Sequence, residues 1–426
     1  MDGSEMDCNK PLTFVAVMRH PSIFMICAFL ISMVQGFAQE SQSGMYRAVL
    51  ERQDGLPIVF NLDINRSNGA EVWTIQNATE RIRVTDIRSS GDSTWVSMPL
   101  FESDFHLKRS ADGGYTGVWI KGTTGQPMVM PVVIKPGSTR FPIQETKPRG
   151  NISGRWSVTF IRPNGTSRPA VGEFEQRGQQ LTGTFITPSG DYRFLEGVVN
   201  GDSIQLSCFD GSHAYFIGAR IGADGNIYNG VFASSATWLE PWYAIKNPNA
   251  KVDASLSAMQ LRPGEDRIGF RFPDIDSQMV SLSDPRFAGK VVVIQIMGSW
   301  CPNCMDETAF LSDYYQKNKS RGVEMIALAY EYSTDFQRAS KSLRKFQQRF
   351  NVQYPMLITG VTSADSLKTE KTLPQLTPIK AFPTTIFIGK DGKVKKIHSG
   401  FEGPGTGARH DLFKEEFETT ITSLLK

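Results

Sequence analysis

The segment Trp300–Cys304, with the sequence WCPNC, decides the fold of the C-terminal third of this chain. It lies between Lys290–Met297, an apolar run that predicts a buried strand, and Met305–Lys317, which predicts a helix. Cys301 is therefore expected at a strand-to-helix corner, where free backbone N–H groups and the helix dipole stabilise a negative charge. Because the thiolate is the reactive form of cysteine, we expect Cys301 to be the nucleophile and Cys304 the resolving thiol of a redox pair.

Two other uses of this cysteine pair are weaker. A structural zinc site needs four ligands, and after Cys304 only His398 and His410 could add to the set. A purely structural disulfide would close a very short loop, which gains little from chain entropy. The sequence therefore predicts neither a metal nor a cofactor.

A second signal lies in Ala381–Thr385, with the sequence AFPTT, directly before the apolar strand predicted for Ile386–Ile388. A proline at the entry of a central strand gives no ladder hydrogen bond, so we expect Pro383 to be a cis-proline held for function. The remaining elements are expected in the order of a thioredoxin fold: a strand over Glu324–Ala329, a helix over Thr334–Phe350, a hairpin ending near Ile397 and a last helix over Asp411–Leu425.

Residues 266–426 resemble the ResA/TlpA branch of the thioredoxin family. Glu307, three residues after Cys304, stands where that branch has an acidic residue thought to assist proton transfer. Gln295 stands where cytoplasmic thioredoxins have a buried aspartate and this branch has an amide, and Phe382–Thr385 matches the cis-proline segment. The resemblance implies an α/β thioredoxin-like domain. Its implied catalytic residues are Cys301, Cys304, Glu307 and Pro383, and its implied substrate-binding residues are Trp300, Phe382 and Thr384.

The sequence departs from this family in three places. Ala309 replaces a helix-kinking proline, so the active-site helix is expected to be straighter. The stretches Thr359–Ile379 and Ser399–Gly407 are longer than usual and either border the redox site or form plain surface loops.

The function expected from these residues is thiol–disulfide oxidoreduction, most simply the reduction of disulfides in other exported proteins. The family resemblance implies re-reduction by a membrane or exported electron donor. An oxidase or isomerase has the same fold, and Pro302-Asn303 does not decide between them. A peroxidase is disfavoured, because Cys301 follows Trp300 and has its own resolving partner. A rival of another class is a ligand- or protein-binding β protein with an accessory redox domain.

The N-terminus predicts export. The apolar run Ile23–Val34 follows Arg19 and ends near a small-x-small site at Ala38, which is typical of a signal peptide over residues 1–38 with an extension over 1–17. The run is too short for a confident membrane span, although an uncleaved anchor stays open. We expect a periplasmic or otherwise extracytoplasmic protein whose only membrane contact would be an uncleaved signal.

Residues from 45 to 248 predict short strands joined by tight turns, and they repeat. Gly91–Ser93 recurs as Gly201–Ser203, and Gly117–Trp119 recurs as Gly230–Phe232. The sequence therefore predicts two related barrel- or sandwich-like modules, β module 1 over residues 45–140 and β module 2 over 150–248. A polar linker is expected over 249–265. We expect the β half, residues 45–248, and the redox domain, residues 266–426, to fold separately.

The β half shows no catalytic group in its sequence. His106 and His213 read as ordinary strand residues, and Cys208 as a small buried residue. Trp238, Trp242 and Tyr243 are expected to form one aromatic cluster with Phe232. The net charge of +3 is small and unclustered, so nucleic acid is not expected as a partner.

Overall fold

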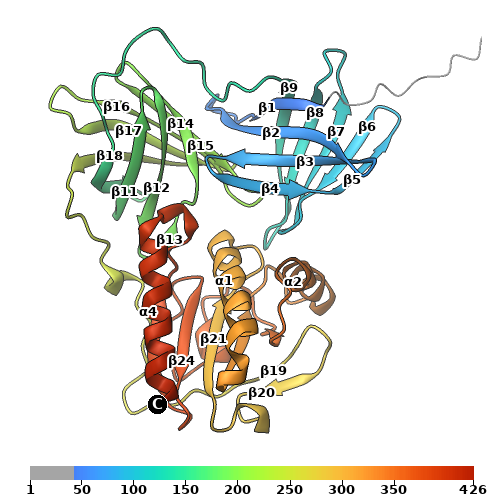
Figure 1. Ribbon diagram of the computed structural model, residues 1–426, viewed down its shortest axis with the longest axis vertical. Helices are drawn as coiled ribbons and strands as arrows, with labels where there is room; N and C mark the ends of the chain where they lie inside the picture. The colour runs from blue at the N-terminus through green and yellow to red at the C-terminus, as the bar shows by residue number, and fades with distance from the viewer. Residues whose placement is uncertain (1–42) are drawn as a thin grey trace, which may run out of the picture. The chain divides into compact units, whose positions relative to one another are not determined.

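The structure, a computed structural model, describes residues 43–426, so the predicted signal peptide lies outside the described residues. The chain forms two nine-stranded sheets, one five-stranded sheet and a two-stranded hairpin (Figure 1). The expected fold class, an all-β N-terminal half followed by an α/β thioredoxin-like domain, is confirmed.

β module 1 is a meander in which every neighbouring pair is antiparallel, in the order β4-β3-β2-β1-β9-β8-β7-β6-β5. Only Thr85 separates β4 from β5, so the two edge strands of the rolled sheet are consecutive in the chain. The interior is filled by large side chains such as Phe60, Trp73, Phe105 and Trp119. The strands are β1 Gly44–Leu50, β2 Ile58–Ser67, β3 Ala70–Asn77, β4 Glu80–Val84, β5 Asp86–Ser90, β6 Ser93–Ser97, β7 Ser103–Arg109, β8 Tyr115–Lys121 and β9 Met128–Pro136.

β module 2 is closed, because β11 pairs with β12 in addition to the order β11-β10-β18-β17-β16-β15-β14-β12-β13. Its interior holds Phe160, Phe185, Phe232 and Trp242, and Cys208 is buried among them as expected. The strands are β10 Gly154–Ile161, β11 Ser167–Arg177, β12 Gln180–Thr187, β13 Gly190–Asp191, β14 Leu195–Asn200, β15 Ser203–Phe209, β16 Ala214–Ile221, β17 Ile227–Ser234 and β18 Trp238–Lys246.

The repeated sequence motifs occupy matching places in the two modules. Gly91–Ser93 joins β5 to β6, and Gly201–Ser203 joins β14 to β15. Gly117–Trp119 lies in β8 and Gly230–Phe232 in β17, and each of these strands pairs with the last strand of its module. The common strand order supports an origin of the two modules by duplication.

The expected aromatic cluster of β module 2 is wrong as one unit. Trp242 and Phe232 are buried inside the barrel, but Trp238 is 47% exposed and Tyr243 is 40% exposed. The two-residue period of a strand sends Tyr243 to the face opposite Trp242. Trp238 has the same parity as Trp242, but it is the first residue of β18 and lies outside the buried part of the strand.

The redox domain has the sheet order β23-β22-β21-β24-β25. β23, β22 and β21 are parallel to one another, whereas β24 is antiparallel to both of its neighbours, β21 and β25. Its strands are β19 Arg271–Pro273, β20 Met279–Ser281, β21 Val291–Met297, β22 Val323–Ala329, β23 Met356–Ile358, β24 Thr384–Ile388 and β25 Val394–Ser399. Its helices are α1 Pro302–Asn318, α2 Phe336–Phe350, α3 Lys368–Thr372 and α4 Ala408–Leu425. Short 3₁₀ turns occur at Ala254–Leu256, Pro285–Phe287, Lys319–Arg321 and Pro404–Thr406.

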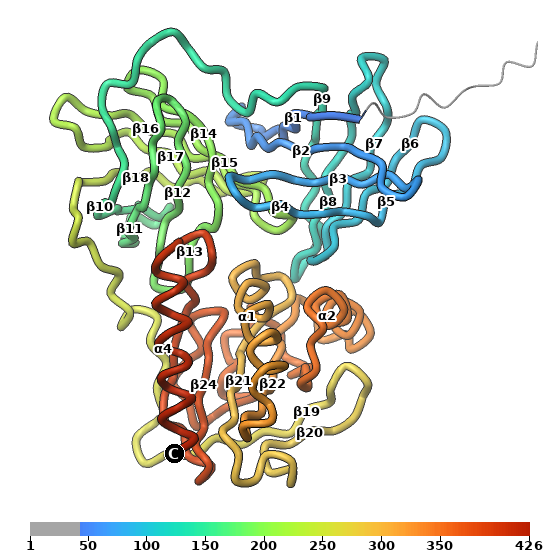
Figure 2. Tube along the Cα trace, viewed as in Figure 1, coloured from blue at the N-terminus to red at the C-terminus, as the bar shows by residue number. Residues whose placement is uncertain are grey.

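Alternate residues of β21 enter two different cores. Val291 and Val293 face α1, α2 and α4, whereas Val292 and Ile294 face a second layer built by residues 259–287 and 373–379. Figure 2 shows α1 beside β21 in the centre of the domain. The strand is therefore buried on both faces and ends at the dithiol turn, and α1 runs unbroken through Ala309.

The β half and the redox domain share a buried interface. Phe101 of β module 1 packs in the core of the redox domain, with its ring centroid 6.5 Å from that of Phe346. Glu102 forms an ion pair at 2.6 Å with Arg338 of α2. The polar stretch after β18 also docks on protein, since Ala250 packs on β module 2 and Met259 on the redox core. These contacts weigh against separate folding of the two halves.

Candidate active site around a buried dithiol

The two cysteines sit differently at the start of α1. Cys301 is the residue that caps the helix, and its Sγ accepts a hydrogen bond of 3.3 Å from the Cys304 backbone N–H. Its thiol also lies 3.5 Å from the Phe382 carbonyl oxygen, to which it donates. Cys301 is 6% exposed and lines a pocket, whereas Cys304 is fully buried. Burial, with the hydrogen bond to Cys301 and its charge, raises the pKa of the Cys304 thiol well above its ordinary value.

Glu307 lies one helical turn beyond Cys304 and is also fully buried. One of its carboxylate oxygens accepts a hydrogen bond from the Thr385 hydroxyl of β24. The other, Oε2, has no hydrogen-bond partner among residues 43–426. Burial raises the pKa of Glu307 to about 7, against the opposing hydrogen bond of Thr385. A buried carboxyl that titrates near neutral pH beside a buried thiol is suited to proton transfer.

Gln295 ties the end of β21 to the start of α1. Its amide donates to the Cys304 carbonyl oxygen at 3.3 Å and accepts from the Thr308 hydroxyl at 3.1 Å. An amide at this buried position adds no charge next to Glu307.

The peptide bond between Phe382 and Pro383 is cis, as expected from the sequence. Phe382 lines the pocket beside Cys301. Thr384 does not belong to that lining: it is 1% exposed, and its hydroxyl donates to the Ala381 carbonyl oxygen at 2.9 Å. The structure thus brings Phe382 to the dithiol and turns Thr384 inward.

The loop before Cys301 is held by the end of β22. Glu331 accepts hydrogen bonds from the Ser299 N–H at 2.8 Å and from its hydroxyl at 2.5 Å, and burial raises the pKa of Glu331 to about 7. The Trp300 indole donates to the Tyr330 carbonyl and stacks on Tyr332, with ring centroids 5.5 Å apart. Sequence reasoning missed Glu331 and Tyr332, although both directly follow a predicted strand.

A pocket of about 320 Å³ lies over Cys301, and the β modules build most of one wall. β module 1 contributes Lys121 at the end of β8, and β module 2 contributes the β12–β13 turn and the turn before β16. Gly190, with φ of 142°, lies where an added side chain would meet Asn303 at 2.7 Å, which explains how the barrel approaches the dithiol so closely. The Ser212 hydroxyl donates to the Trp300 carbonyl oxygen at 2.8 Å.

The expectation that His213 is an ordinary strand residue is wrong. It lies in the turn before β16, lines the pocket, and pairs through Nδ1 with Asp210 Oδ2 at 3.1 Å. The pKa of Asp210 lies below its usual range, because His213 and Arg193 outweigh the opposing effect of burial. The sequence signal was the turn Asp210-Gly211-Ser212-His213, which collects polar groups between two apolar strands. His106, by contrast, is an exposed residue of β7, as expected.

Arg193 joins three parts of the chain behind the pocket. Its guanidinium, 2% exposed, pairs with Glu80 of β module 1, with Asp210 of its own module at 3.3 Å and with Asp306 of α1. It also donates to the Pro302 carbonyl oxygen at 3.4 Å. Asp191 adds contacts to Asn303 and to the Gly403 N–H at 2.7 Å, so the 399–407 loop borders the site.

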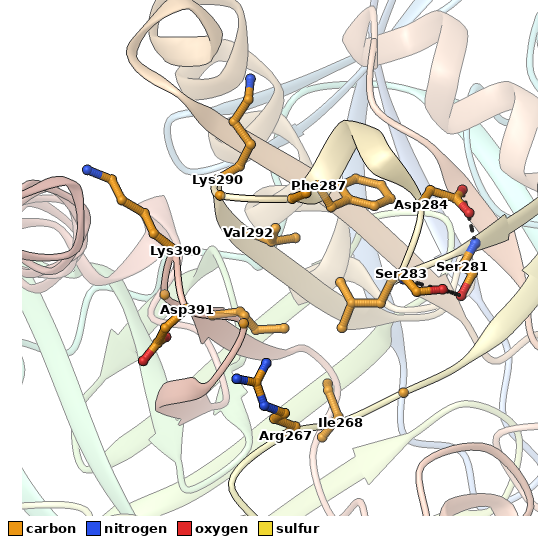
Figure 3. Close-up of a pocket in the computed structure, with 17 residues that line it drawn as sticks. Arg267, Ile268, Ser281, Ser283, Asp284, Phe287, Lys290, Val292, Lys390 and Asp391 are labelled. Atoms are coloured by element: carbon orange, nitrogen blue, oxygen red, sulfur yellow. Dashed lines mark hydrogen bonds between the residues drawn. The ribbon is translucent and has the colours of Figure 1, made fainter.

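A second pocket, of about 430 Å³, lies at the opposite end of β21 (Figure 3). Arg267, Lys290 and Lys390 line it together with Asp284 and Asp391. It holds neither cysteine nor the groups that contact them. Within residues 43–426 no group of three or more His, Cys, Asp or Glu side chains is arranged to hold a metal ion.

Comparison with known proteins finds similarity over the C-terminal region. The Redoxin family matches residues 264–413. The thiol-disulfide oxidoreductase ResA of Bacillus thuringiensis subsp. konkukian is 29% identical over 131 residues, which cover 31% of this chain and 66% of that protein. ResA of Halalkalibacterium halodurans is 27% identical over 153 residues, covering 36% of this chain and 74% of that protein. The chain thus spans about two thirds of the length of the curated relatives that it matches.

Among solved structures, a thiol:disulfide interchange protein of the thioredoxin family from Chlorobium tepidum TLS has a TM-score of 0.28 and 17% identity. That likeness covers 39% of this chain and 99% of the other. The observed sheet order makes the C-terminal region a thioredoxin-like domain, and its sequence is similar to the Redoxin family and to the thiol-disulfide oxidoreductase ResA.

Proposed function

We propose that this protein is an exported thiol–disulfide oxidoreductase that reduces disulfides through Cys301 and Cys304. The observation that carries the proposal is the asymmetry of the pair, with Cys301 capping α1 at a pocket and Cys304 buried behind it. A thiol that faces a pocket and accepts a backbone N–H bond is fit to attack, whereas a buried thiol is fit to act second.

The reaction runs in two exchanges. The Cys301 thiolate attacks one sulfur of the substrate disulfide, so that a mixed disulfide forms and the other substrate sulfur leaves as a thiolate that takes up a proton. Cys304 then loses its proton and attacks the Cys301 sulfur, which releases the second substrate thiol and leaves a Cys301–Cys304 disulfide. Two electrons pass from the dithiol to the substrate, and a dithiol donor restores the starting state.

Glu307 is the proposed acceptor of the Cys304 proton. Its unpartnered oxygen and its pKa of about 7 support this role, because the ionised carboxylate forms near the pH at which the thiol has to be activated. Phe382, which precedes the cis-proline Pro383, lies on the other side of Cys301, and its carbonyl oxygen accepts from the Cys301 thiol. We expect this backbone to pair with a substrate chain once the thiol is ionised.

Export is proposed from the apolar run before Ala38 and from the similarity to ResA. Within residues 43–426 no helix is long and apolar enough to cross a membrane. A membrane or exported dithiol donor would then supply electrons, and protein disulfides are the substrates that the family resemblance implies.

The test of this function is a single-turnover titration of the pre-reduced protein with a disulfide substrate, followed by acid quenching and alkylation of the remaining thiols. We expect two substrate thiols to appear for each Cys301–Cys304 disulfide formed, as seen by mass. A dithiol that stays reduced with every disulfide offered would contradict the proposal.

Glu307→Gln is expected to slow the second exchange by about 10- to 100-fold at pH 8, because the proton acceptor for Cys304 is lost. In the wild type the rate of this step should rise as the pH passes through about 7, where Glu307 ionises, and this rise should be absent in the variant. Stopped-flow measurement of substrate release from the mixed disulfide gives the rate. Glu415→Gln, at an exposed position of α4, is the matched control and should keep the wild-type profile.

The same substitution is expected to raise stability at alkaline pH. The folded-state pKa of Glu307, about 7, lies above its ordinary value of 4.5, so its contribution is fully present below pH 4.5 and is lost as the pH rises through about 7. We therefore expect the free energy of unfolding of Glu307→Gln, relative to that of the wild type, to be about 2 kcal/mol more favourable at pH 8 than at pH 5. Chemical unfolding at the two pH values measures it. An equal difference at both pH values would mean that Glu307 does not titrate in this range.

A further inference from the structure

The pocket over Cys301 has two unlike walls. The redox domain supplies the reacting sulfur and an aromatic side formed by Trp300, Tyr332 and Phe382. The β modules supply the opposite side, where Lys121 and His213 bring basic nitrogen atoms. A molecule whose disulfide reaches Cys301 therefore extends its other end toward these basic groups.

Both basic side chains converge on one turn that is tied to the dithiol loop. The Lys121 ammonium donates to the Ser212 carbonyl oxygen at 2.7 Å, and His213 is the next residue. The Ser212 hydroxyl in turn donates to the carbonyl of Trp300, which directly precedes Cys301. Lys121 is therefore two hydrogen bonds away from the residue that adjoins the nucleophile.

The Lys121 ammonium keeps donors for a ligand. An ammonium has three N–H donors, and Ser212 accepts one of them. The acidic groups around the pocket are engaged elsewhere: Asp191 accepts from the N–H groups of Arg193 and Gly403, and Asp210 pairs with His213 and Arg193. Burial lowers the pKa of Lys121 to about 8, so the group is mostly charged at neutral pH.

The pocket is small. Its volume of about 320 Å³ is at the lower end of the range for small-molecule sites. Pro302 and Asn303, between the two cysteines, are buried beneath β module 2. Cys301 is itself 6% exposed, which favours a small substrate over a folded protein domain at this sulfur.

We infer that this pocket binds a small disulfide that carries a carboxylate, and that Lys121 is the residue that selects it. The inference rests on the proposed function, and it assigns a small substrate in place of the protein disulfides that the family resemblance implies. The carboxylate lies against Lys121 and the disulfide against Cys301. Attack then follows the two exchanges above: the small disulfide gains two electrons and two protons and leaves as two thiols, while the protein forms the Cys301–Cys304 disulfide.

The test is a single-turnover assay of pre-reduced protein with three disulfides of similar size and different charge. 3,3′-Dithiodipropionate is anionic, 2-hydroxyethyl disulfide is neutral and cystamine is cationic. We expect second-order rates in that order, with about 10-fold or more between the first and the last, as one charged contact implies. Two further substrates test whether the disulfide and its negative charge can belong to a larger molecule: insulin, a folded protein, and a short acidic peptide that contains a cystine. Both should react more slowly than dithiodipropionate.

Lys121→Gln is expected to lower the rate with dithiodipropionate by about 10-fold while leaving the rate with hydroxyethyl disulfide within about 2-fold. Lys121→Arg keeps the charge, so it should keep the preference for the anionic over the neutral disulfide. This second variant tests the role of the charge even if Lys121→Gln folds poorly. Lys108→Gln, on the exposed side of β7, is the matched control and should behave as wild type.

The outcomes separate this inference from the proposed function. Equal rates with all three small disulfides, or equal losses for all of them in Lys121→Gln, would overturn the role of Lys121 and leave the reductase intact. Insulin or the peptide reacting as fast as dithiodipropionate would overturn the small-substrate inference. No reaction with any disulfide would count against the proposed function itself.

Discussion

Cys301→Ser is expected to abolish disulfide reduction, with a loss of at least about 10⁴-fold in rate, because the nucleophile is removed and neither Cys304 nor Cys208 can replace it. Cys304 is fully buried and its thiol has a strongly raised pKa, so little thiolate forms there at neutral pH. Cys208 is enclosed in β module 2. The single-turnover assay with alkylation of remaining thiols measures the loss directly.

Cys304→Ser is expected to give a different failure. Attack by Cys301 remains, but the mixed disulfide is no longer resolved, so an adduct of protein and substrate accumulates and is visible by mass or on a non-reducing gel. Cys208→Ala is the control and should keep both exchanges. Adduct formation by Cys301→Ser, with none by Cys304→Ser, would show that the two roles are reversed.

The local chemistry of the redox site follows from the sequence because its parts are contiguous or fixed by the fold. Residues 300–304 place two cysteines in one turn between an apolar strand and a helix. Cys301 therefore caps the helix, and Cys304 lies within its first turn. Phe382, next to the cis-proline Pro383, reaches Cys301 because β24 pairs with β21, which the thioredoxin order requires. Burial of Glu307 was not predictable from its type, since it depends on β24 covering that face of α1.

The β half shows where sequence reasoning ends. Alternation and turn residues predict strands, and the repeat at Gly91–Ser93 and Gly201–Ser203 predicts two modules of one kind. Neither pattern says which rim of a barrel meets another domain. In the sequence, His213 and Lys121 look like ordinary residues at strand ends. They line the pocket over Cys301 because elements far apart in the chain come together there.

Arg193 is the clearest such case. Nothing in the sequence around Asp191-Tyr192-Arg193-Phe194 marks it, yet its guanidinium is among the largest fully buried side chains of the described residues. Its backbone adopts a left-handed conformation with φ of 57°, and its N–H is held by the Asp191 carboxylate at 2.6 Å. The turn aims the guanidinium at carboxylates of three parts of the chain.

Arg193→Gln is expected to lower the free energy of unfolding by about 3 kcal/mol or more at neutral pH, because Glu80, Asp210 and Asp306 are left without their buried cation. Burial already raises the pKa values of Glu80 and Asp306 despite the attraction of Arg193. Part of the loss should return as the pH falls toward 5, since protonation removes the unpaired charges. Urea unfolding at both pH values measures the change.

The exposed pair of Arg177 and Glu175 on β11 supplies the control, because their side chains are 80% and 61% exposed and such pairs add little stability. Arg177→Gln should therefore unfold like the wild type. Arg193→Gln should also loosen the wall of the pocket, so alkylation of Cys301 by a bulky maleimide should speed up in this variant alone. Unfolding and alkylation unchanged from wild type would mean that the ionic cluster does not hold the β modules on the dithiol.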